Sequence, residues 1–382
     1  MFRRLDRSLL PVALASLSIA LILLSLHSTA SAAPSGTTFD HIVIIAMENQ
    51  NYGSVIGSSS APFINSLAAQ GSTISNYHSY GQNIGGCSAG CYEAFTSGQQ
   101  SHSDGWCPRA SSPCYNISNI ADQLHTAGLT SAMFCEDGCP RGADHFPWIA
   151  YTSTWNQCVT GSFTCNGSQT GSAGNVLYGS LSSNGNSAFI NYLNGASPAS
   201  YIWFTPSDSH NMHDNSVSSG DSYVKTLLVG TGTISSPSSN SVLGSDLFKT
   251  PGTFLYLWWD ESGDSSGISA NVEYGSMIQV GYTSTGGYTE YNSLHTIEAN
   301  WGLPYVTNIV SGDSSMSDLF GGAPQVPTGT PASALSTITL LYIGLIGGGA
   351  ISVIAYLAQY HSRNRRLARM LKESRRGGSR SK

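Results

Sequence analysis

The feature that most constrains the fold is an apolar run that stops at two oxygen-bearing side chains. Residues 42–45, Ile-Val-Ile-Ile, predict a fully buried strand of a parallel sheet. Glu48 and Asn49 follow where that strand should end. Ligands of open α/β sheets bind beyond the carboxyl ends of strands, and hard metal ions bind such oxygens. The stretch therefore predicts a metal-binding site at the end of this strand. The alternative is that Glu48 is an acid at the start of a helix and Asn49 a turn residue.

Two later apolar runs, residues 201–204 and 254–259, also end in side chains that bind metals or move protons. These are His210, His213 and Asp214 after the first run, and Asp260 and Glu261 after the second. Adjacent carboxylates are costly to bury without a cation, because each raises the pKa of the other. A solvated turn is the alternative for an Asp-Glu pair alone, but three such endings favour convergence on one sheet edge.

The same alternation of apolar runs with polar stretches predicts an α/β fold. Residues 124–134 have the pattern of a helix end followed by a strand, whereas the Ser- and Gly-rich residues 178–186 and 230–245 are typical of connections. We expect a central, mostly parallel sheet flanked by helices, with a transmembrane helix after it.

Charge is sparse, at 10% of residues, and its distribution excludes one class of partner. Between residues 8 and 362 there are twenty Asp and Glu but only Arg109, Arg141, Lys225 and Lys249 among the basic residues. A surface this acidic repels phosphate backbones, so we expect no nucleic-acid partner.

Both termini point to export and membrane attachment. A basic start, an apolar run and Ala30-Ser31-Ala32 predict a signal peptide, with an uncleaved anchor as the alternative. A second uncharged run is long enough to cross a bilayer of about 30 Å, and the basic residues after it predict a cytoplasmic side. The predicted parts are a signal peptide (1–32), an extracellular domain (33–320), a Pro/Gly stalk (321–333), a transmembrane helix (334–358) and a basic cytoplasmic tail (359–382).

This organisation predicts a single-pass protein of the cell membrane with its large domain outside. Gly344 and Gly348 have the GxxxG spacing of paired membrane helices, which would allow a homodimer, but the same spacing also occurs where helices merely pack closely. Asn116 and Asn166 begin glycosylation sequons, which matter only in a host that glycosylates surface proteins.

The eight cysteines fit an oxidising compartment, where disulfides are expected. Their spacing suggests local bridges, although many connectivities are open and a zinc site is the rival interpretation. The suggested pairs are Cys87–Cys91, Cys107–Cys114, Cys135–Cys139 and Cys158–Cys165.

Ser88 is the candidate nucleophile. Gly85 and Gly86 precede it and permit a tight turn, and the residues from Ser88 to Phe95 predict a helix whose free N–H groups would favour an anion. A nearby metal could lower the pKa of the hydroxyl enough for attack on phosphorus. An ordinary helix N-cap is the alternative role for this serine.

These pieces, taken in order, resemble the phosphoesterase family that contains bacterial phospholipases C and acid phosphatases, within the alkaline-phosphatase-like superfamily. The similarity extends over about residues 38 to 310. It is carried by six segments, residues 41–51, 88–98, 144–147, 205–214, 260–261 and 288–304.

The resemblance implies the fold of an alkaline-phosphatase-like sandwich. It also implies a metal-dependent hydrolase of phosphate esters, acting on a phosphate monoester or a phospholipid-type substrate. It implies a divalent metal ion held by Glu48, Asn49, Asp260 and Glu261. Ser88 would form a phosphoseryl intermediate that water then cleaves. His145, His210 and His213 would contact phosphate oxygens or protonate the leaving group, and Asp214 would orient a histidine or bind metal.

Several positions depart from the family pattern. Glu290 stands where the family commonly has His, His295 where it has Arg, and His210-Asn211 where it has Asn-Asp. The Pro-Asn-Tyr that follows the family's serine is Gly90-Cys91-Tyr92 here. These changes leave open a non-catalytic cell-surface or adhesion protein with the same fold. A sulfatase or nucleotide pyrophosphatase relative is the rival enzyme, but Ser88 lacks the Pro and Arg of a sulfatase nucleophile.

Overall fold

A computed structural model describes residues 36–79, 88–99, 115–136, 145, 147–154, 171–173, 176–181 and 187–321. All of them lie in the first of two units, residues 1–326 and 327–382. The predicted signal peptide, stalk, transmembrane helix and cytoplasmic tail fall outside the described residues, apart from Gly321 at the start of the stalk. Among the helices that are described, none has the length and apolar character needed to cross a membrane.

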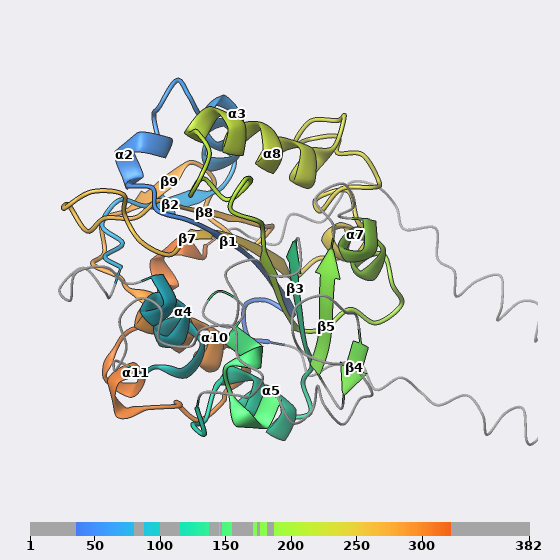
Figure 1. The fold of residues 1–382 in the computed structure, drawn as a ribbon, viewed down its shortest axis with the longest axis vertical. Coiled ribbons are helices and arrows are strands. Elements are labelled where there is room, and N and C mark those ends of the chain that lie inside the picture. Colours follow the sequence, from blue (N-terminus) through green and yellow to red (C-terminus); the bar gives the residue numbers. More distant parts are fainter. Residues whose placement is uncertain are drawn as a thin grey trace, which may run out of the picture. The chain divides into compact units, whose positions relative to one another are not determined.

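The centre of the molecule is one mixed sheet with the strand order β4-β5-β3-β6-β1-β7-β8-β2-β9 (Figure 1). The five neighbours β5, β3, β6, β1 and β7 are mutually parallel, while β4 and β8 run against them. The strands are β1 (His41–Met47), β2 (Ser72–Ile74), β3 (Ser131–Glu136), β4 (Gly171–Ala173), β5 (Val176–Leu181), β6 (Tyr201–Thr205), β7 (Thr253–Trp259), β8 (Asn271–Tyr274) and β9 (Tyr282–Ser284).

Helices cover both faces of the sheet, as the α/β pattern predicts (Figure 1). Helices α4, α5 and α10 pack on one face, and α3, α7 and α8 on the other. The helices are α2 (Tyr52–Val55), α3 (Pro62–Ala68), α4 (Ser88–Ser97), α5 (Ile120–Thr126), α7 (Ser187–Leu193), α8 (Val217–Val229), α9 (Asp246–Lys249), α10 (Glu290–Trp301) and α11 (Asn308–Gly312), with 3-10 turns at η3 (Pro147–Ile149) and η4 (Ser317–Leu319).

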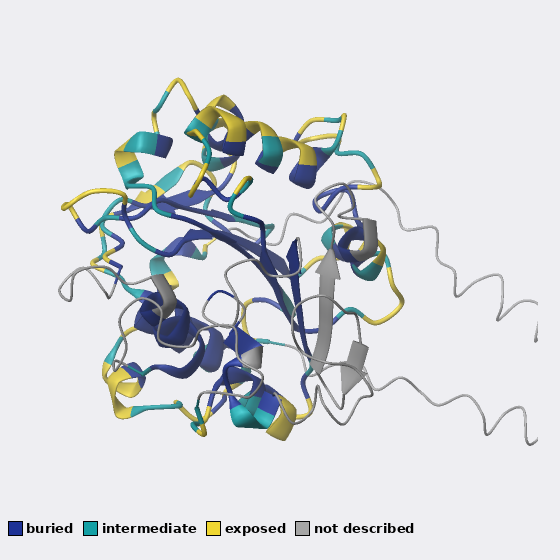
Figure 2. Cartoon of the chain, viewed as in Figure 1, coloured by how far each residue is buried: buried dark blue, intermediate teal, exposed yellow. Residues whose placement is uncertain are grey.

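Strand β1 is apolar on both sides because both of its faces are covered. Ile42, Ile44 and Ala46 belong to the core under α4 and α10, while Val43 and Ile45 belong to the core under α8. Successive side chains of a strand alternate between faces, so a strand between two helical layers needs a continuous apolar run. Figure 2 shows the central strands buried along their whole length.

The strands expected within residues 42–45, 201–204 and 254–259 are confirmed, as is the helix end followed by a strand at 124–134. The interpretation of residues 178–186 as a connection is partly wrong, because β5 extends to Leu181. Its Tyr-Gly-Ser-Leu sequence has weak strand propensity, but pairing along β3 overrides that preference.

Candidate active site

Glu48 and Asp260 lie side by side just beyond the carboxyl ends of two neighbouring strands. Met47 of β1 is in register with Trp259 of β7, so the residue that follows each strand is level with the other. The Asp260 N–H donates to the carbonyl of Met47 (3.1 Å), and the Asn49 N–H donates to Asp260 Oδ1 (3.2 Å). The two carboxylates that the sequence predicted at one edge are therefore brought together, and both are fully buried.

His145 completes a group of three possible metal ligands with Glu48 and Asp260. Its Nε2 lies 3.4 Å from Glu48 Oε1, and one ligand atom from each residue lies within 4.8 Å of the others. The His145 carbonyl accepts a hydrogen bond from Thr205 Oγ1 at the end of β6 (2.9 Å). The sequence led us to expect that this histidine contacts phosphate or protonates the leaving group, and its ring also lies among groups that could hold a metal ion.

Electrostatics in this cluster call for a cation. Burial is the largest cause that raises the pKa of Asp260 well above its usual value, and the nearby Glu48 and Glu261 raise it further. The described ranges contain two Lys or Arg side chains, Lys225 and Lys249. Lys249 forms an ion pair with Asp246 and not with a carboxylate of this cluster. A divalent ion would remove this like-charge penalty, and two carboxylates with an imidazole are ordinary ligands for one.

Asn49 supplies an independent sign that the site fits a metal. Its backbone has a positive φ of 47°, which is uncommon for a residue other than glycine. Its side-chain Oδ1 is buried and has no hydrogen-bond partner among the residues that the structure describes. A buried amide oxygen without a partner is costly, and a hard cation would satisfy it.

Helix α4 connects the predicted nucleophile to this cluster. The Tyr92 hydroxyl donates to Glu48 Oε1 (2.8 Å), and the rings of Tyr92 and His145 lie 4.8 Å apart. Ser88 is the first residue of α4, four residues before Tyr92, so both lie on the same side of the helix. The position of the Ser88 side chain itself falls outside the described residues.

The segment from 205 to 214 passes beside Glu48. The Glu48 N–H donates to the Asn211 carbonyl (2.9 Å), which attaches this segment to the end of β1. His213 Nδ1 lies 2.6 Å from Asp214 Oδ1, and the Asp214 side chain is 66% exposed. Asp214 thus has the expected contact with a histidine, and it lies outside the three-residue cluster. Glu261 is half-buried and also lies outside this cluster, but its N–H donates to Asp260 Oδ1 (2.7 Å).

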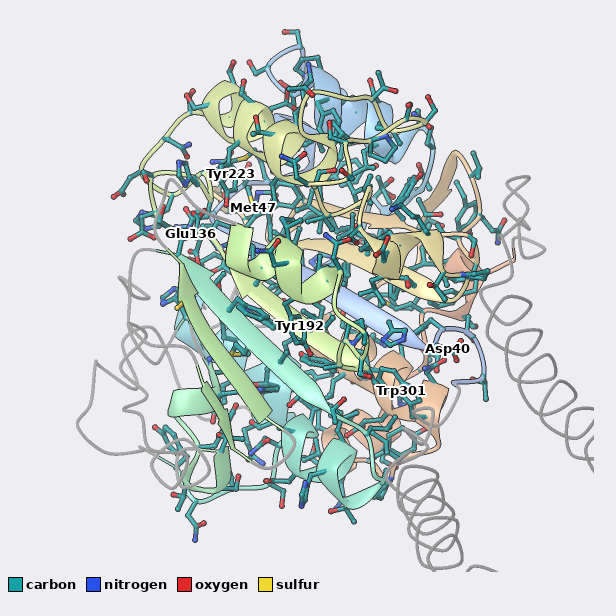
Figure 3. All side chains as sticks on the ribbon, turned by 90° about the vertical axis from the view of Figure 1, so that its right-hand side faces the viewer. Asp40, Met47, Glu136, Tyr192, Tyr223 and Trp301 are labelled. Atoms are coloured by element: carbon teal, nitrogen blue, oxygen red, sulfur yellow. The ribbon has the colours of Figure 1, made fainter. Side chains whose placement is uncertain are left out.

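Sequence reasoning missed Glu136, the last residue of β3. This carboxylate is fully buried and accepts hydrogen bonds from the Ser207 N–H, His210 Nδ1 and the Tyr223 hydroxyl. Met47, Glu136 and Tyr223 lie near one end of the sheet, far from Asp40 and Trp301 (Figure 3). The signal was available, since Glu136 ends an apolar strand just as Glu48 and Asp260 follow theirs.

Disulfide bonds are present in part of the cysteine set. Cys91 on α4 and Cys135 on β3 are both disulfide-bonded and buried. The remaining six cysteines lie outside the described residues, so the suggested pairings stay predictions.

The comparisons with known proteins agree with the expected chemistry. No protein-family model matches the chain. A phosphatidylinositol-3-phosphatase of Mycobacterium tuberculosis (strain ATCC 25618 / H37Rv) is 28% identical over 298 residues, which cover 73% of this chain and 82% of the relative.

Solved structures with a similar outline include a protein of the alkaline phosphatase superfamily from Vibrio parahaemolyticus (TM-score 0.46, 12% identity, 75% of this chain and 73% of that one). Another is murine ectonucleotide pyrophosphatase/phosphodiesterase 5 (TM-score 0.46, 6% identity, 74% and 100%). The resemblance to phosphoesterases that the sequence motifs indicated is confirmed by the relative over most of the chain, a phosphatidylinositol-3-phosphatase.

Proposed function

We propose that this chain is a metal-dependent phosphoesterase that hydrolyses phosphate monoesters, including those on lipid headgroups, through Ser88 as the nucleophile. The observation that carries the proposal is the buried Glu48–His145–Asp260 cluster at the carboxyl edge of the sheet. The relative that acts as a phosphatidylinositol-3-phosphatase supports the choice of a phosphorylated lipid as substrate class.

Glu48, His145 and Asp260 would hold the divalent ion, with Asn49 Oδ1 as a further oxygen donor. When bound, such an ion polarises a phosphoryl oxygen and favours the deprotonated form of a nearby hydroxyl. The chain's own groups do the rest. Tyr92 fixes the Glu48 carboxylate through its hydroxyl, and the backbone N–H groups of Asn49 and Glu261 fix the Asp260 carboxylate.

Ser88 would attack phosphorus from the N-terminal end of α4, where unpaired backbone N–H groups favour a phosphate group. Attack forms the Ser88 Oγ–phosphorus bond and breaks the bond from phosphorus to the leaving alcohol, which takes up a proton. Water then cleaves the phosphoseryl ester and regenerates the serine. His213, with Nδ1 held by Asp214, is suited to move one of these protons at Nε2.

We further propose that the enzyme acts outside the cell and is held at the membrane by residues 334–358. The uncharged run, the basic residues after it and the cysteine-rich first half support this location. A lipid-headgroup substrate would then lie in or near the same bilayer. A homodimer through Gly344 and Gly348 remains an expectation of the sequence alone.

The test is hydrolysis by the purified protein of an aryl phosphate and of phosphatidylinositol 3-phosphate in vesicles, before and after exhaustive chelation. We expect release of inorganic phosphate that chelation abolishes and that added divalent metal restores. Protein that binds metal but releases no phosphate from either substrate would instead support the alternative, a non-catalytic surface protein that keeps this fold.

A further inference from the structure

A second polar cluster lies at the same edge of the sheet as the metal-binding residues, on the other face. Cys135 of β3 pairs with Thr205 of β6, and Phe204 pairs with Ile45 of β1. Glu136 is therefore level with Met47, one residue short of Glu48. Two strand spacings separate β3 from β1, which is about 10 Å.

The alternation of side chains decides which face each acid occupies. Cys135 packs under α4, so Glu136, the next residue, points toward α8, from which Tyr223 reaches it. Glu48 follows Met47, which packs under α8, and so points toward α4. The Glu136 cluster is thus distinct from the candidate metal site and is joined to it by the segment that contains His210 and Asn211.

The three donors around Glu136 fix the orientation of its carboxyl group. Oε2 accepts from the Ser207 N–H (3.0 Å) and from His210 Nδ1 (2.8 Å), and Oε1 accepts from the Tyr223 hydroxyl (2.6 Å). A carboxylate can only accept hydrogen bonds, so Nδ1 of His210 carries the hydrogen. The Tyr223 ring also stacks on the imidazole at 4.2 Å with an interplanar angle of 7°, which prevents the ring from tilting.

These contacts leave the other nitrogen of His210 available. Within the described residues all hydrogen bonds of this ring are made by Nδ1, and 26% of the side chain is exposed. A buried carboxylate that binds Nδ1–H selects the tautomer in which Nε2 can exchange a proton or, when protonated, bind an anion. His210 also stands next to Asn211, whose carbonyl binds the Glu48 backbone.

We infer that Glu136 is a positioning residue for catalysis: it holds His210 in one tautomer and one orientation, so that Nε2 is the nitrogen offered to a phosphate oxygen of the substrate. Tyr223 acts together with Glu136: its hydroxyl donates a hydrogen bond to the second carboxylate oxygen, and its ring stacks on the imidazole of His210. This inference rests on the proposed phosphoesterase activity, and it assigns a task to a carboxylate on the opposite face from the metal-binding acids.

The first test is a double-mutant cycle on kcat/KM with the full-length protein. Glu136→Ala should lower kcat/KM by about 10- to 100-fold, the usual cost of losing the group that orients a functional histidine. In a His210→Ala background the same change should cost less than about 3-fold, because Glu136 would have no ring left to position. An equal loss in both backgrounds would show that Glu136 only supports the fold, and would overturn the inference.

Two further variants keep the cycle interpretable. Glu136→Gln retains the shape of the side chain if Glu136→Ala fails to fold. Glu273→Gln is the matched control, because Glu273 is an equally buried carboxylate of the same sheet, on β8. Its substitution should leave kcat/KM within about 2-fold of the unmodified protein, which is the scatter expected when no transition-state contact is lost.

The second test does not depend on turnover. Nitrogen-15 NMR of the histidine rings should show His210 with hydrogen on Nδ1, and inorganic phosphate added with divalent metal should shift the Nε2 resonance. Glu136→Gln should weaken or abolish that shift. A His210 ring that is protonated on Nε2 alone, or that ignores phosphate, contradicts the inference. Missing turnover with an intact phosphate response would instead count against the proposed function.

Discussion

Asp260 shows how a single buried residue can stabilise or destabilise the molecule depending on a bound ion. Its pKa is raised first by burial and then by Glu48 and Glu261. A raised folded-state pKa means that its contribution to stability is present at low pH, below the ordinary value of 3.8, and is lost as the pH rises and the group ionises. In the metal-free protein, ionising Asp260 therefore costs free energy, and a bound cation would offset that cost.

We expect Asp260→Asn to raise the melting temperature of the metal-free protein at neutral pH, because it removes a carboxyl group whose ionisation is unfavourable in the buried cluster. The same change should abolish the rise in melting temperature on adding metal, which for saturation at 100 times Kd corresponds to about 2.7 kcal/mol. Thermal unfolding with and without metal measures both effects. Asp246→Asn, at an exposed acid, is the control and should change neither. If metal still raised the melting temperature of Asp260→Asn as much as that of the unmodified protein, Asp260 would not be a metal ligand.

Glu298 on α10 offers a test of pH dependence away from the candidate site. Burial raises its pKa to about 7 from an ordinary 4.5, although the Val306 N–H donates to it at 2.9 Å and opposes the shift. Its contribution to stability is thus complete below pH 4.5 and disappears as the pH rises toward 7 and beyond. We expect Glu298→Gln to flatten the fall in melting temperature over this interval. Identical pH profiles for the two proteins would contradict the shifted pKa.

At the scale of secondary structure, α4 determines where the nucleophile stands. Phe95 packs its ring 5.3 Å from Trp203 of β6 and 5.0 Å from Trp258 of β7, and Tyr92 lies 5.2 Å from Trp258. Aromatic pairs at these separations are favourable beyond the area they bury. The middle of the helix is therefore fixed against the two strands that border β1, and its first residue, Ser88, is carried with it.

Ser88→Ala should lower kcat on an aryl phosphate by several powers of ten while the melting temperature stays unchanged, because a covalent nucleophile is lost without loss of packing. Ser97→Ala is the matched control at the other end of the same helix, where the hydroxyl donates to the Glu93 carbonyl (3.0 Å). That variant should keep its activity. Ser88→Ala activity within about one power of ten of the unmodified protein would show that another group attacks phosphorus.

At the scale of the whole molecule, more of the described Asp and Glu side chains have a raised pKa than a lowered one. Burial is the largest cause of each raised carboxyl pKa. The pKa values of Asp264 and Asp318 are lowered instead, because hydrogen bonds stabilise the carboxylate form of these side chains. The groups with raised pKa are Asp122, Asp221, Asp260, Glu273, Glu298 and Asp313. Where most shifted groups bind protons more tightly in the folded state, stability increases as the pH falls from neutral.

We expect the metal-free protein to melt at a higher temperature near pH 5 than near pH 8, because the groups with raised pKa lose their contribution to stability as the pH rises. The scarcity of Lys and Arg between residues 8 and 362 limits charge repulsion once the carboxyl groups are protonated. Calorimetry across this interval in the presence of a chelator is the measurement. A melting temperature that falls steadily with acidification would contradict the excess of raised pKa values.

We also predict a pH optimum of activity below neutral, set at its acidic end by release of metal from protonated ligands.

The sequence by itself determined the four central strands β1, β3, β6 and β7 and, for β1, β6 and β7, the polar side chains that follow them. Strand β1 could be read from Ile42 to Ile45 because burial on both faces demands an unbroken apolar run, and this demand is local. Glu48 and Asp260 were recognisable as candidates because each follows such a run directly. Helix α4 and its first residue, Ser88, were likewise evident from neighbouring residues alone.

Only the tertiary structure decided which strand ends meet. The pairing of β1 with β7 makes Glu48 and Asp260 neighbours although 211 residues separate them in the chain. His145 joins them, and Glu136 meets His210 and Tyr223, through contacts between segments that are distant in sequence. Strand order, register and the face that each side chain occupies depend on long-range packing, so residues that act only through such neighbours leave no local pattern to read.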